Sequence, residues 1–392
     1  MKKILIFSLA YYPSFVSGAE AAIKEIADRI DPSDIEFHMI TLLFDHATPR
    51  EELVGHVHVH RIGFGSAYLS KMLFIPLAAL TARMLDRKLH FDAVWAVMTY
   101  MLFPAVLARF LGVRASRVLT LQDGDPYEKV FNRWFIRPLA PILDYGFHIT
   151  SVVQVISHFL GTWPPKRGYK GQIELIRNGA NPKDLKESVS SDEVEALKKK
   201  LGKKHGEIWL TNTARLVYQK GNDDTIRALK MLPEQVKLLL VGGGEDDAML
   251  KTLVKELGLE SRVIFTGPVD RSEVTTYRKA SDIFVGPSRS EGLGNAFLSA
   301  MASHLPVVAT QEGGLADFLF DVKRNPDQPT TGWAVDKNSP KQIALAVNDI
   351  LAHPEEVKKV TENARRMVLE NYDWDIIARQ MRERVFGRVL KS

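Results

Sequence analysis

The stretch Glu291–Thr310, EGLGNAFLSAMASHLPVVAT, decides the fold that we expect for this chain. It opens with an acidic residue, turns through Gly292 and Gly294, and continues as a short helix that Leu305-Pro306 ends before an apolar strand. A glycine-rich turn at a helix start gathers unpaired backbone N–H groups and the positive end of the helix dipole. Such a turn suits phosphate, and Glu291 beside it suits hydroxyl groups. The other interpretation is an ordinary loop of an α/β domain.

The length and composition predict a soluble protein of two domains. A chain of 392 residues exceeds one typical core, and 45% hydrophobic with 25% charged residues is ordinary. The absence of cysteine excludes disulfides and fits a reducing compartment, so we expect a cytoplasmic location. The start, MKKILIFSLAYYPS, resembles a buried strand more than a signal peptide. The net charge of +5 is dispersed without a nucleic-acid motif, which argues against nucleic acid as a partner.

Strand-like and helix-like segments alternate through both halves of the chain, as in parallel sheets covered by helices. Strands are expected in the first half at Lys3–Leu9, Ile35–Leu43, Val57–Ile62, Ala93–Val97, Arg117–Leu121, His148–Ile156 and Gln172–Ile176. In the second half they are expected at Glu207–Thr213, Gln235–Val241, Arg262–Gly267, Ile283–Gly286, Pro306–Thr310 and Gly332–Val335. We expect domains at 1–185 and 186–370 and a closing helix over 371–392, because turn signals cluster near Asn181-Pro182.

Two cations follow the first strand of the second half. Arg215 and Lys220, with Gly221 at the next helix start, would clamp a diphosphate by a fork of donors and a point charge. The alternative is a pair of solvated surface cations. Gly242, Gly243 and Gly244 follow the next strand and permit close backbone approach to a ligand. They do not form a GxGxxG fingerprint, which disfavours a nicotinamide cofactor.

Taken together, these segments resemble glycosyltransferase family 4 (glycosyl transferases group 1), whose members are retaining enzymes with the GT-B fold. The resemblance covers nearly the whole chain, and the long segment from residue 288 to 314 is its most specific part. It rests on SGAE (17–20), IRNGANP (176–182), ARLVYQKG (214–221), VGGGED (241–246), FTGPV (265–269), SRSEGLGNAFLSAMASHLPVVATQEGG (288–314) and the closing YDWDIIARQMRERV (372–385).

The resemblance implies two Rossmann-like domains facing each other across a cleft, with the C-terminal helix crossing back to the first domain. Residues 1–185 would bind the acceptor and 186–370 the donor. The implied reaction moves a sugar from a nucleoside-diphosphate sugar (UDP- or GDP-sugar) to a glycan, lipid-linked or polysaccharide acceptor in cell-envelope glycan synthesis. No metal or other cofactor is required, and electrostatic stabilisation of the departing diphosphate would supply much of the catalysis.

The resemblance also implies roles for individual residues. Arg215 and Lys220 would bind the donor phosphates, and Glu291 would contact the hydroxyls of the transferred sugar. The amides of residues 293–297 would meet sugar and phosphates, the loop 267–269 the base, and Gly18 the diphosphate. The implied donor-binding set is Gly18, Gly244, Gly267, Pro268, Val269, Leu293, Gly294, Asn295, Ala296, Phe297 and Ser299.

Two positions depart from the family pattern. Ser299 stands where the family has a second Glu that holds the ribose, and Gln122 stands where the family often has His. Gln122 can bond a sugar hydroxyl but cannot shuttle protons, and Asp123 would substitute for it in a catalytic role. These departures keep open a nucleotide-sugar-binding homologue or subunit without catalysis. An epimerase or a phosphorylase of the same fold is a further alternative.

Three other features allow more than one interpretation. Asp123-Gly124-Asp125 spells a DxD metal motif, but turn chemistry alone favours Asp-Gly. His56, His58 and His60 alternate, so they would face one side of a strand, either as metal ligands or as a solvated face. The segment Tyr68–Leu89 is either a core helix with a basic exposed end or a docking site for an anionic membrane, with a peripheral location.

Overall fold

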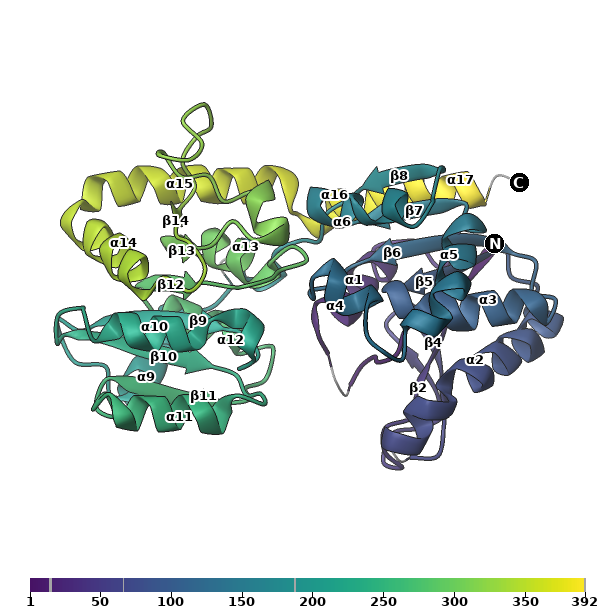
Figure 1. Cartoon of the computed structure of the whole chain (residues 1–392), viewed down its shortest axis with the longest axis horizontal. Helices are drawn as coiled ribbons and strands as arrows, with labels where there is room; N and C mark the ends of the chain where they lie inside the picture. The colour runs from purple at the N-terminus through teal and green to yellow at the C-terminus, as the bar shows by residue number, and fades with distance from the viewer. Residues whose placement is uncertain (14–15, 66, 187, 391–392) are drawn as a thin grey trace. The chain divides into compact units, whose positions relative to one another are not determined.

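The computed structural model describes residues 1–13, 16–65, 67–186 and 188–390. The chain divides into two compact units, Met1–Asn178 with Trp374–Ser392, and Gly179–Asp373. Each unit is an α/β layer structure built on one sheet, as Figure 1 shows. The predicted α/β class with two parallel-sheet domains is therefore confirmed.

The first unit contains an eight-stranded sheet in the order β3-β4-β2-β1-β5-β6-β7-β8, parallel except for the edge strand β3. Its strands are β1 (Lys2–Phe7), β2 (Ile35–Leu42), β3 (Glu51–Val54), β4 (Val57–Ile62), β5 (Ala93–Val97), β6 (Ser116–Leu121), β7 (Val152–Val155) and β8 (Gln172–Leu175). Its main helices are α1 (Gly18–Ala27), α2 (Ala67–Leu89), α3 (Leu102–Phe110), α4 (Tyr127–Phe131), α5 (Ala140–His148), α6 (His158–Gly161) and α7 (Trp163–Lys166).

The C-terminal helix belongs to this first unit. It runs as α16 (Trp374–Gln380), a π-helical segment over Met381–Phe386 and α17 (Gly387–Val389). Phe386 packs edge-on against Trp95 with ring centroids 5.1 Å apart, and Trp374 and Ile377 are buried in the same core as Ile23 of α1. The apolar spacing that predicted a closing helix is thus the face that completes this core.

The second unit contains a fully parallel six-stranded sheet in the order β11-β10-β9-β12-β13-β14. Its strands are β9 (Ile208–Thr213), β10 (Val236–Val241), β11 (Val263–Gly267), β12 (Ile283–Gly286), β13 (Val307–Ala309) and β14 (Trp333–Ala334). Its helices are α8 (Pro182–Leu185), α9 (Ser191–Leu201), α10 (Asn222–Leu229), α11 (Asp247–Glu256), α12 (Val274–Lys279), α13 (Asn295–Ala302), α14 (Pro340–Ala352) and α15 (Pro354–Asn371). The order reverses between β9 and β12, where doubly wound sheets open a crevice for ligands.

The structure corrects three local expectations in the first unit. The strand expected over His148–Ile156 is shorter, because residues up to His148 complete α5 and only Val152–Val155 pair with β6. The antiparallel strand β3 was missed, because its alternately exposed sequence carries few apolar residues. His56 lies in the turn before β4, so only His58 and His60 share a strand face.

The chain passes from the first unit to the second between Asn178 and Gly179, where the sequence suggested a boundary near residue 185. The intervening residues are tied to the second unit by buried polar contacts. Ala180 N donates to Tyr372 O at 3.0 Å, and the fully buried Asp184 forms an ion pair with Arg278 of α12. A buried carboxylate needs such a partner, which fixes α8 within this unit.

Candidate functional site

Lys220 and Glu291 meet at the switch point of the second sheet. Lys220 comes from the loop after β9, Glu291 from the loop after β12, and Lys220 Nζ donates to Glu291 Oε1 at 2.5 Å. Ser288 Oγ donates to the same oxygen at 3.0 Å, and Thr310 Oγ1 donates to Ser288 O at 2.6 Å. The Glu291 side chain is only 9% exposed, so its position is set by these bonds.

Two glycines after β13 hold the backbone of Glu291 in place. Gly314 N donates to Glu291 O at 3.0 Å. A Cβ on Gly313 would lie 2.0 Å from that same oxygen, and Gly313 has a φ of +62°, which disfavours other residues. The sequence motif alone does not indicate this role for the glycine pair. Its function is visible only once the two loops are brought together.

The turn before α13 presents backbone rather than side chains. Gly294 is the N-cap of α13 with a φ of +103°. Leu293 and Phe297 point into the core, where the Phe297 ring packs edge-on against Phe284 at 5.1 Å. Asn295 and Ala296 occupy the first turn, whose amides have no preceding intrahelical acceptor. What this turn can offer an anion is therefore its backbone N–H groups.

Arg289 connects the two loops that carry Lys220 and Glu291, and sequence reasoning assigned it no role. Its guanidinium is bound bidentately to Asp223 at 2.9 Å for both bonds, and it also donates to Asp224 at 2.8 Å. It stacks on the Tyr218 ring at 4.3 Å, and its own backbone N donates to Gln219 O at 2.7 Å. The planar guanidinium group of Arg289 thus holds the loop before α10 against the loop after β12.

Arg215 is exposed and has no ion-pair or hydrogen-bond partner for its guanidinium among the residues that the structure describes. Its loop is supported by the glycines after β10. A Cβ on Gly242 would lie 2.3 Å from Ala214 O, and one on Gly244 would lie 2.1 Å from Leu216 O. The close approach that these glycines permit is thus to the backbone on either side of Arg215.

The loop Gly267–Val269 lies beside these glycines at the same edge of the sheet. Gly242 N donates to Gly267 O at 3.1 Å, and the Pro268 ring lies against Gly243. Val269 is partly buried against a cluster that includes Trp209. Ser299 lies deeper, on α13, where its buried Oγ accepts a bond from Asn181 N at 3.0 Å. The serine therefore holds the segment that enters the second unit.

Asp123 follows β6 in the first unit and is buried beside Thr99, which follows β5. Thr99 Oγ1 donates to Asp123 Oδ2 at 2.9 Å, and Thr99 N donates to the same oxygen at 3.3 Å. Burial outweighs these bonds and raises the pKa of Asp123 to about 6. The neighbouring Gln122 Oε1 accepts from Asn178 Nδ2 at 2.7 Å. A carboxyl with this pKa changes charge close to neutral pH.

The remaining predicted positions of the first unit have local partners. Gly18 is the first residue of α1, and the capping box before it uses Glu20, whose Oε2 accepts from Ser17 N at 2.7 Å. Asp125 of the DxD sequence pairs with Lys129 at 2.9 Å and with Arg133 at 3.2 Å. Asp123 and Asp125 thus have different partners.

His58 and His60 form a stacked cluster with His38 of β2. The ring centroids are 4.9 Å and 5.5 Å from that of His38, and His38 Nδ1 lies 3.2 Å from His60 Nε2. Burial lowers the pKa of both His38 and His60. Across the described ranges, no three or more His, Cys, Asp or Glu residues group as a metal site.

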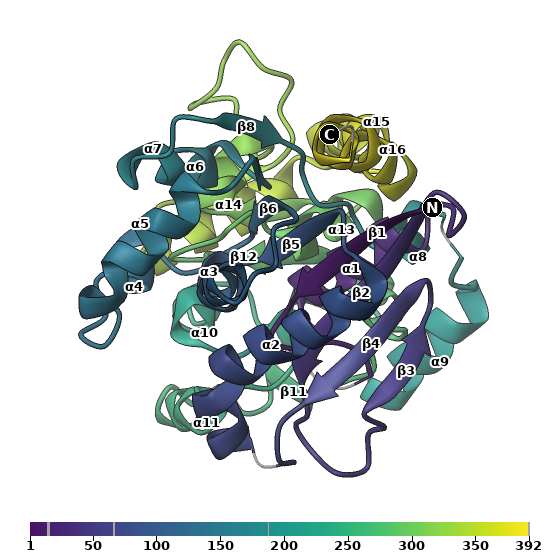
Figure 2. The ribbon, with the colours of Figure 1, turned by 90° about the vertical axis from the view of Figure 1, so that its right-hand side faces the viewer.

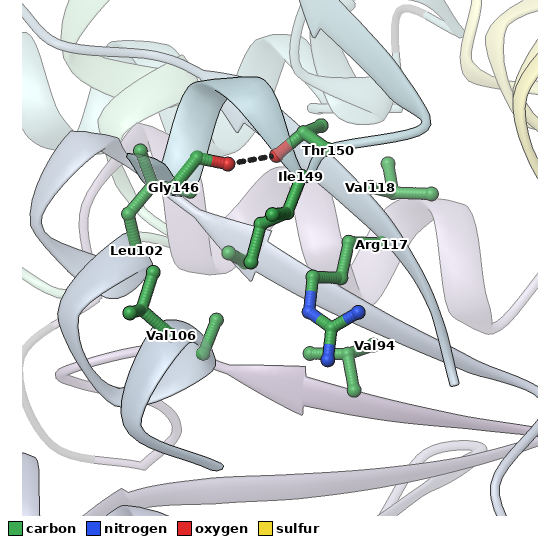
Figure 3. Close-up of a pocket in the computed structure, with 10 residues that line it drawn as sticks. Val94, Leu102, Val106, Arg117, Val118, Gly146, Ile149 and Thr150 are labelled. Atoms are coloured by element: carbon green, nitrogen blue, oxygen red, sulfur yellow. Dashed lines mark hydrogen bonds between the residues drawn. The ribbon is translucent and has the colours of Figure 1, made fainter. Parts of the chain in front are cut away.

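A small apolar cavity lies between α3, α5 and the first sheet (Figure 3). Arg117 is buried there and donates to Val113 O at 2.7 Å and Ala115 O at 3.0 Å, and burial lowers its pKa to about 10. It is the second residue of β6, at the amino end of that strand, whereas Asp123 follows the carboxyl end. Ligands of such sheets bind at the carboxyl ends, so this cavity is not part of the site.

The chain is similar in sequence to known glycosyltransferases. Residues 193–367, which contain Arg215, Lys220 and Glu291, match the sequence model of the family described as glycosyl transferases group 1. The chain is 27% identical over 331 residues to a GDP-mannose-dependent alpha-(1-6)-phosphatidylinositol monomannoside mannosyltransferase of Mycobacterium tuberculosis, covering 81% of each. It is 26% identical over 398 residues to the alpha-monoglucosyldiacylglycerol synthase of Acholeplasma laidlawii, covering 92% of this chain and 91% of that protein.

The fold has close counterparts among solved structures. The sucrose-phosphate synthase of Thermosynechococcus elongatus superposes with a TM-score of 0.86 at 22% identity, and the match covers 100% of both chains. Structural neighbours of this kind are GT-B glycosyltransferases, so the GT-B fold predicted from the sequence is confirmed.

Proposed function

We propose that this chain is a group 1 glycosyltransferase, because residues 193–367 match the model of that family and the fold is GT-B. It transfers a sugar from a nucleoside-diphosphate sugar to a carbohydrate or lipid-linked acceptor with retention of configuration. The observation that carries this proposal is the switch-point site of the second unit. There the Lys220–Glu291 pair lies beside the helix N-terminus at Gly294, in the half of the chain that also exposes Arg215.

The donor side of the reaction needs positive charge and hydroxyl acceptors. Arg215 is exposed and unpaired among the described residues, and Lys220 has one carboxylate partner, so both can turn to a diphosphate. Glu291 then accepts hydroxyl hydrogen bonds from the transferred sugar. As the bond between the anomeric carbon and the phosphate oxygen breaks, Arg215 and Lys220 stabilise the negative charge that develops on the leaving diphosphate.

Retention follows from attack on the face that the diphosphate leaves. The acceptor hydroxyl oxygen bonds to the anomeric carbon, and its proton passes to an oxygen of the departing diphosphate. The products are the glycoside and the nucleoside diphosphate. Since protein cations carry the charge, we propose that no metal is needed, and turnover that survives dialysis against EDTA supports this.

We favour a lipid-linked acceptor because the two named relatives both carry a lipid in their names, phosphatidylinositol monomannoside in one and monoglucosyldiacylglycerol in the other. Asp123 is the group of the first unit best suited to accept a hydrogen bond from an acceptor hydroxyl. It lies at the carboxyl ends of β5 and β6, beside Thr99. Burial raises its pKa to about 6, so its charge changes near neutral pH.

Calorimetric titration with UDP, GDP and ADP tests the donor site. We expect one nucleotide to bind selectively and Arg215→Ala to weaken it roughly 10- to 100-fold, the value of a charge-assisted bond of about 1.5–3 kcal/mol. Arg227→Ala is the matched control, because Arg227 is also exposed but lies within α10. If no nucleotide binds, the proposal fails. If a nucleotide binds but no sugar is transferred to lipid or glycan acceptors, the protein is a binding subunit instead.

A further inference from the structure

Large apolar side chains are exposed on the helices that cover one side of the first sheet. Met84 of α2 is 63% exposed, Phe110 at the end of α3 is 69% exposed, and Trp134 before α5 is 84% exposed. Further exposed members of this face are Leu73, Leu80, Leu111, Phe135, Leu139 and Ile142. Soluble proteins expose single apolar residues freely, but a group of this size marks a binding surface.

Most of these residues lie on three helices that are neighbours in the first unit. Figure 2 shows α2, α3 and α5 side by side in the first unit. Arg83 of α2 donates to Gly112 O, just past α3, at 3.4 Å. Phe110 stacks on Tyr145 of α5 with ring centroids 5.6 Å apart. Leu80 and Met84 are therefore joined to Ile142 through the end of α3. We call this surface the apolar–basic face.

The charge on the face is positive. The helices α2, α3 and α5 carry five Lys or Arg residues and two acidic residues. Both acids have cationic partners, since Asp86 pairs with Arg83 at 3.6 Å and Asp144 pairs with Arg167 at 2.5 Å. Arg87 and Lys88 follow Met84 by three and four residues and so project beside it. Together with Arg109, they are exposed and unpaired within the described part of the chain.

We propose that the apolar–basic face docks the enzyme on the surface of an anionic lipid bilayer. Apolar side chains would enter the boundary between headgroups and acyl chains, while the arginines and lysines attract anionic headgroups. A protein partner of ordinary composition would not require this excess of unpaired cations around an apolar centre. No described helix is long and apolar enough to cross a bilayer.

The apolar–basic face also lies near the loop after β6 that carries Asp123, through the segment of Arg133 and Trp134. Trp134 follows Arg133, which pairs with Asp125 at 3.2 Å, and Asp125 is two residues from Asp123. A lipid-linked acceptor held in the bilayer would thus meet the loop that carries Asp123. The docking itself does not depend on the donor chemistry, so it can be tested even if the proposed transfer is wrong.

The tryptophans provide a direct probe of docking by the full chain. Of the six tryptophans, Trp95, Trp163, Trp209, Trp333 and Trp374 are buried, so Trp134 dominates quenching by aqueous acrylamide. At low salt, vesicles of phosphatidylcholine with one-third phosphatidylglycerol should shift the emission to the blue and protect it from the quencher. Vesicles of pure phosphatidylcholine should do so at least tenfold less. Raising the salt concentration should reverse the binding, because exposed charges are then screened.

Co-sedimentation of variants with the same vesicles identifies the surface. Phe110→Ser/Trp134→Ser and the triple variant Arg87→Gln/Lys88→Gln/Arg109→Gln should each bind at least tenfold more weakly. The matched controls in the second unit, Met231→Ser/Leu345→Ser and Lys199→Gln/Lys230→Gln/Lys255→Gln, alter exposed residues of the same kinds and should bind as the native chain does. Circular dichroism verifies that all four variants are folded.

Three outcomes would overturn the proposal. The first is no binding of the native chain to anionic vesicles at low salt. The second is equal loss of binding in the face variants and the control variants, which would mean that charge or hydrophobicity acts without a defined surface. The third is a dimer in sedimentation equilibrium that the face variants abolish, which would assign the face to a second copy of this chain.

Discussion

Lys220 Nζ lies 2.5 Å from Glu291 Oε1, although the two residues are separated by 71 positions in the chain. The cation that should bind diphosphate and the carboxylate that should bind sugar hydroxyls therefore neutralise each other in this structure. Because Ser288 also donates to Glu291, the carboxylate keeps one partner when Lys220 turns to a phosphate. The ion pair thus holds both side chains close to the positions in which they would contact the donor.

Removing Lys220 should damage transfer more than folding. We expect Lys220→Ala to lower kcat/KM about 100- to 1000-fold, the usual loss for one electrostatic group that acts on developing charge. Glu291→Gln, which keeps the size but loses the charge, should raise the donor KM and lower kcat. Steady-state kinetics of both variants and of the double variant measures their coupling.

The exposed pair Lys251–Asp247, at 2.6 Å on α11, is the matched control. Lys251→Ala should change neither kcat/KM nor stability by more than the small value of a surface ion pair. If Lys220→Ala behaved like Lys251→Ala, Lys220 would be an ordinary surface cation, which was the alternative interpretation of the sequence.

Replacing Arg289 should separate the two loops of the donor site. Arg289→Ala leaves Asp223 and the buried Asp224 without their cation, so we expect the free energy of unfolding to fall by about 3–5 kcal/mol. Arg289→Lys should recover only part of this loss, because an ammonium cannot bind Asp223 bidentately or stack on Tyr218 in the same way. Denaturant unfolding measures both.

Activity distinguishes this role from simple stabilisation. At a temperature where Arg289→Lys remains folded, its kcat should still fall, since Lys220 is held less firmly near Glu291. For comparison, the exposed pair Arg324–Asp336, at 2.9 Å, should contribute less than about 1 kcal/mol. An Arg289→Lys variant with native kcat would show that the Arg289 guanidinium does not position Lys220.

Much of the fold could be predicted because many of its strands are short, mainly apolar runs bounded by glycine, proline or charged residues, as at Val236–Val241 and Ile283–Gly286. The strand predicted over His148–Ile156 was too long, because an apolar run can equally belong to the end of a helix, here α5. In the site, local motifs pointed to Lys220 and Glu291. Arg289 was not predictable, since its partners Asp223 and Asp224 are more than sixty positions away and only sheet pairing brings them together.

The ionisation of Asp123 should appear in the pH dependence of stability. Its pKa is about 6 in the folded protein and 3.8 in its ordinary state, so the folded protein binds more protons between these values. The stability of the fold therefore decreases as pH rises through about 4 to 6, by at most about 3 kcal/mol. Asp123→Asn should raise Tm relative to the native chain at pH 7.5, and the difference should vanish near pH 4.

The same substitution should affect the pH profile of transfer. If the carboxylate of Asp123 accepts a hydrogen bond from the acceptor hydroxyl, kcat/KM falls below about pH 6 in the native chain, and Asp123→Asn has a low rate without this decline. Asp125→Asn, whose carboxylate pairs with Lys129 and Arg133 instead, should retain the decline. A native profile that is flat between pH 5 and 7 would exclude Asp123 from the reaction.

Ser299 should act on the fold of the second unit rather than on the nucleotide. Its buried Oγ accepts a bond from Asn181 N at 3.0 Å, so Ser299→Ala should cost about 1 kcal/mol of unfolding free energy. The donor KM should stay within about twofold of the native value. Ser303→Ala, one turn later at the C-cap of α13, should cost more, because Ser303 Oγ donates to the buried carboxylate of Asp184 at 2.6 Å.

Urea unfolding and donor kinetics of these two variants show whether Ser299 acts on stability or on nucleotide binding. A third variant, Ser299→Glu, restores the residue type expected from the family pattern. A buried glutamate at this position has to displace the Asn181 contact, so we expect Ser299→Glu to be less stable than Ser299→Ala. If instead Ser299→Ala kept full stability but raised the donor KM many-fold, the serine would contact the nucleotide, as the resemblance implied.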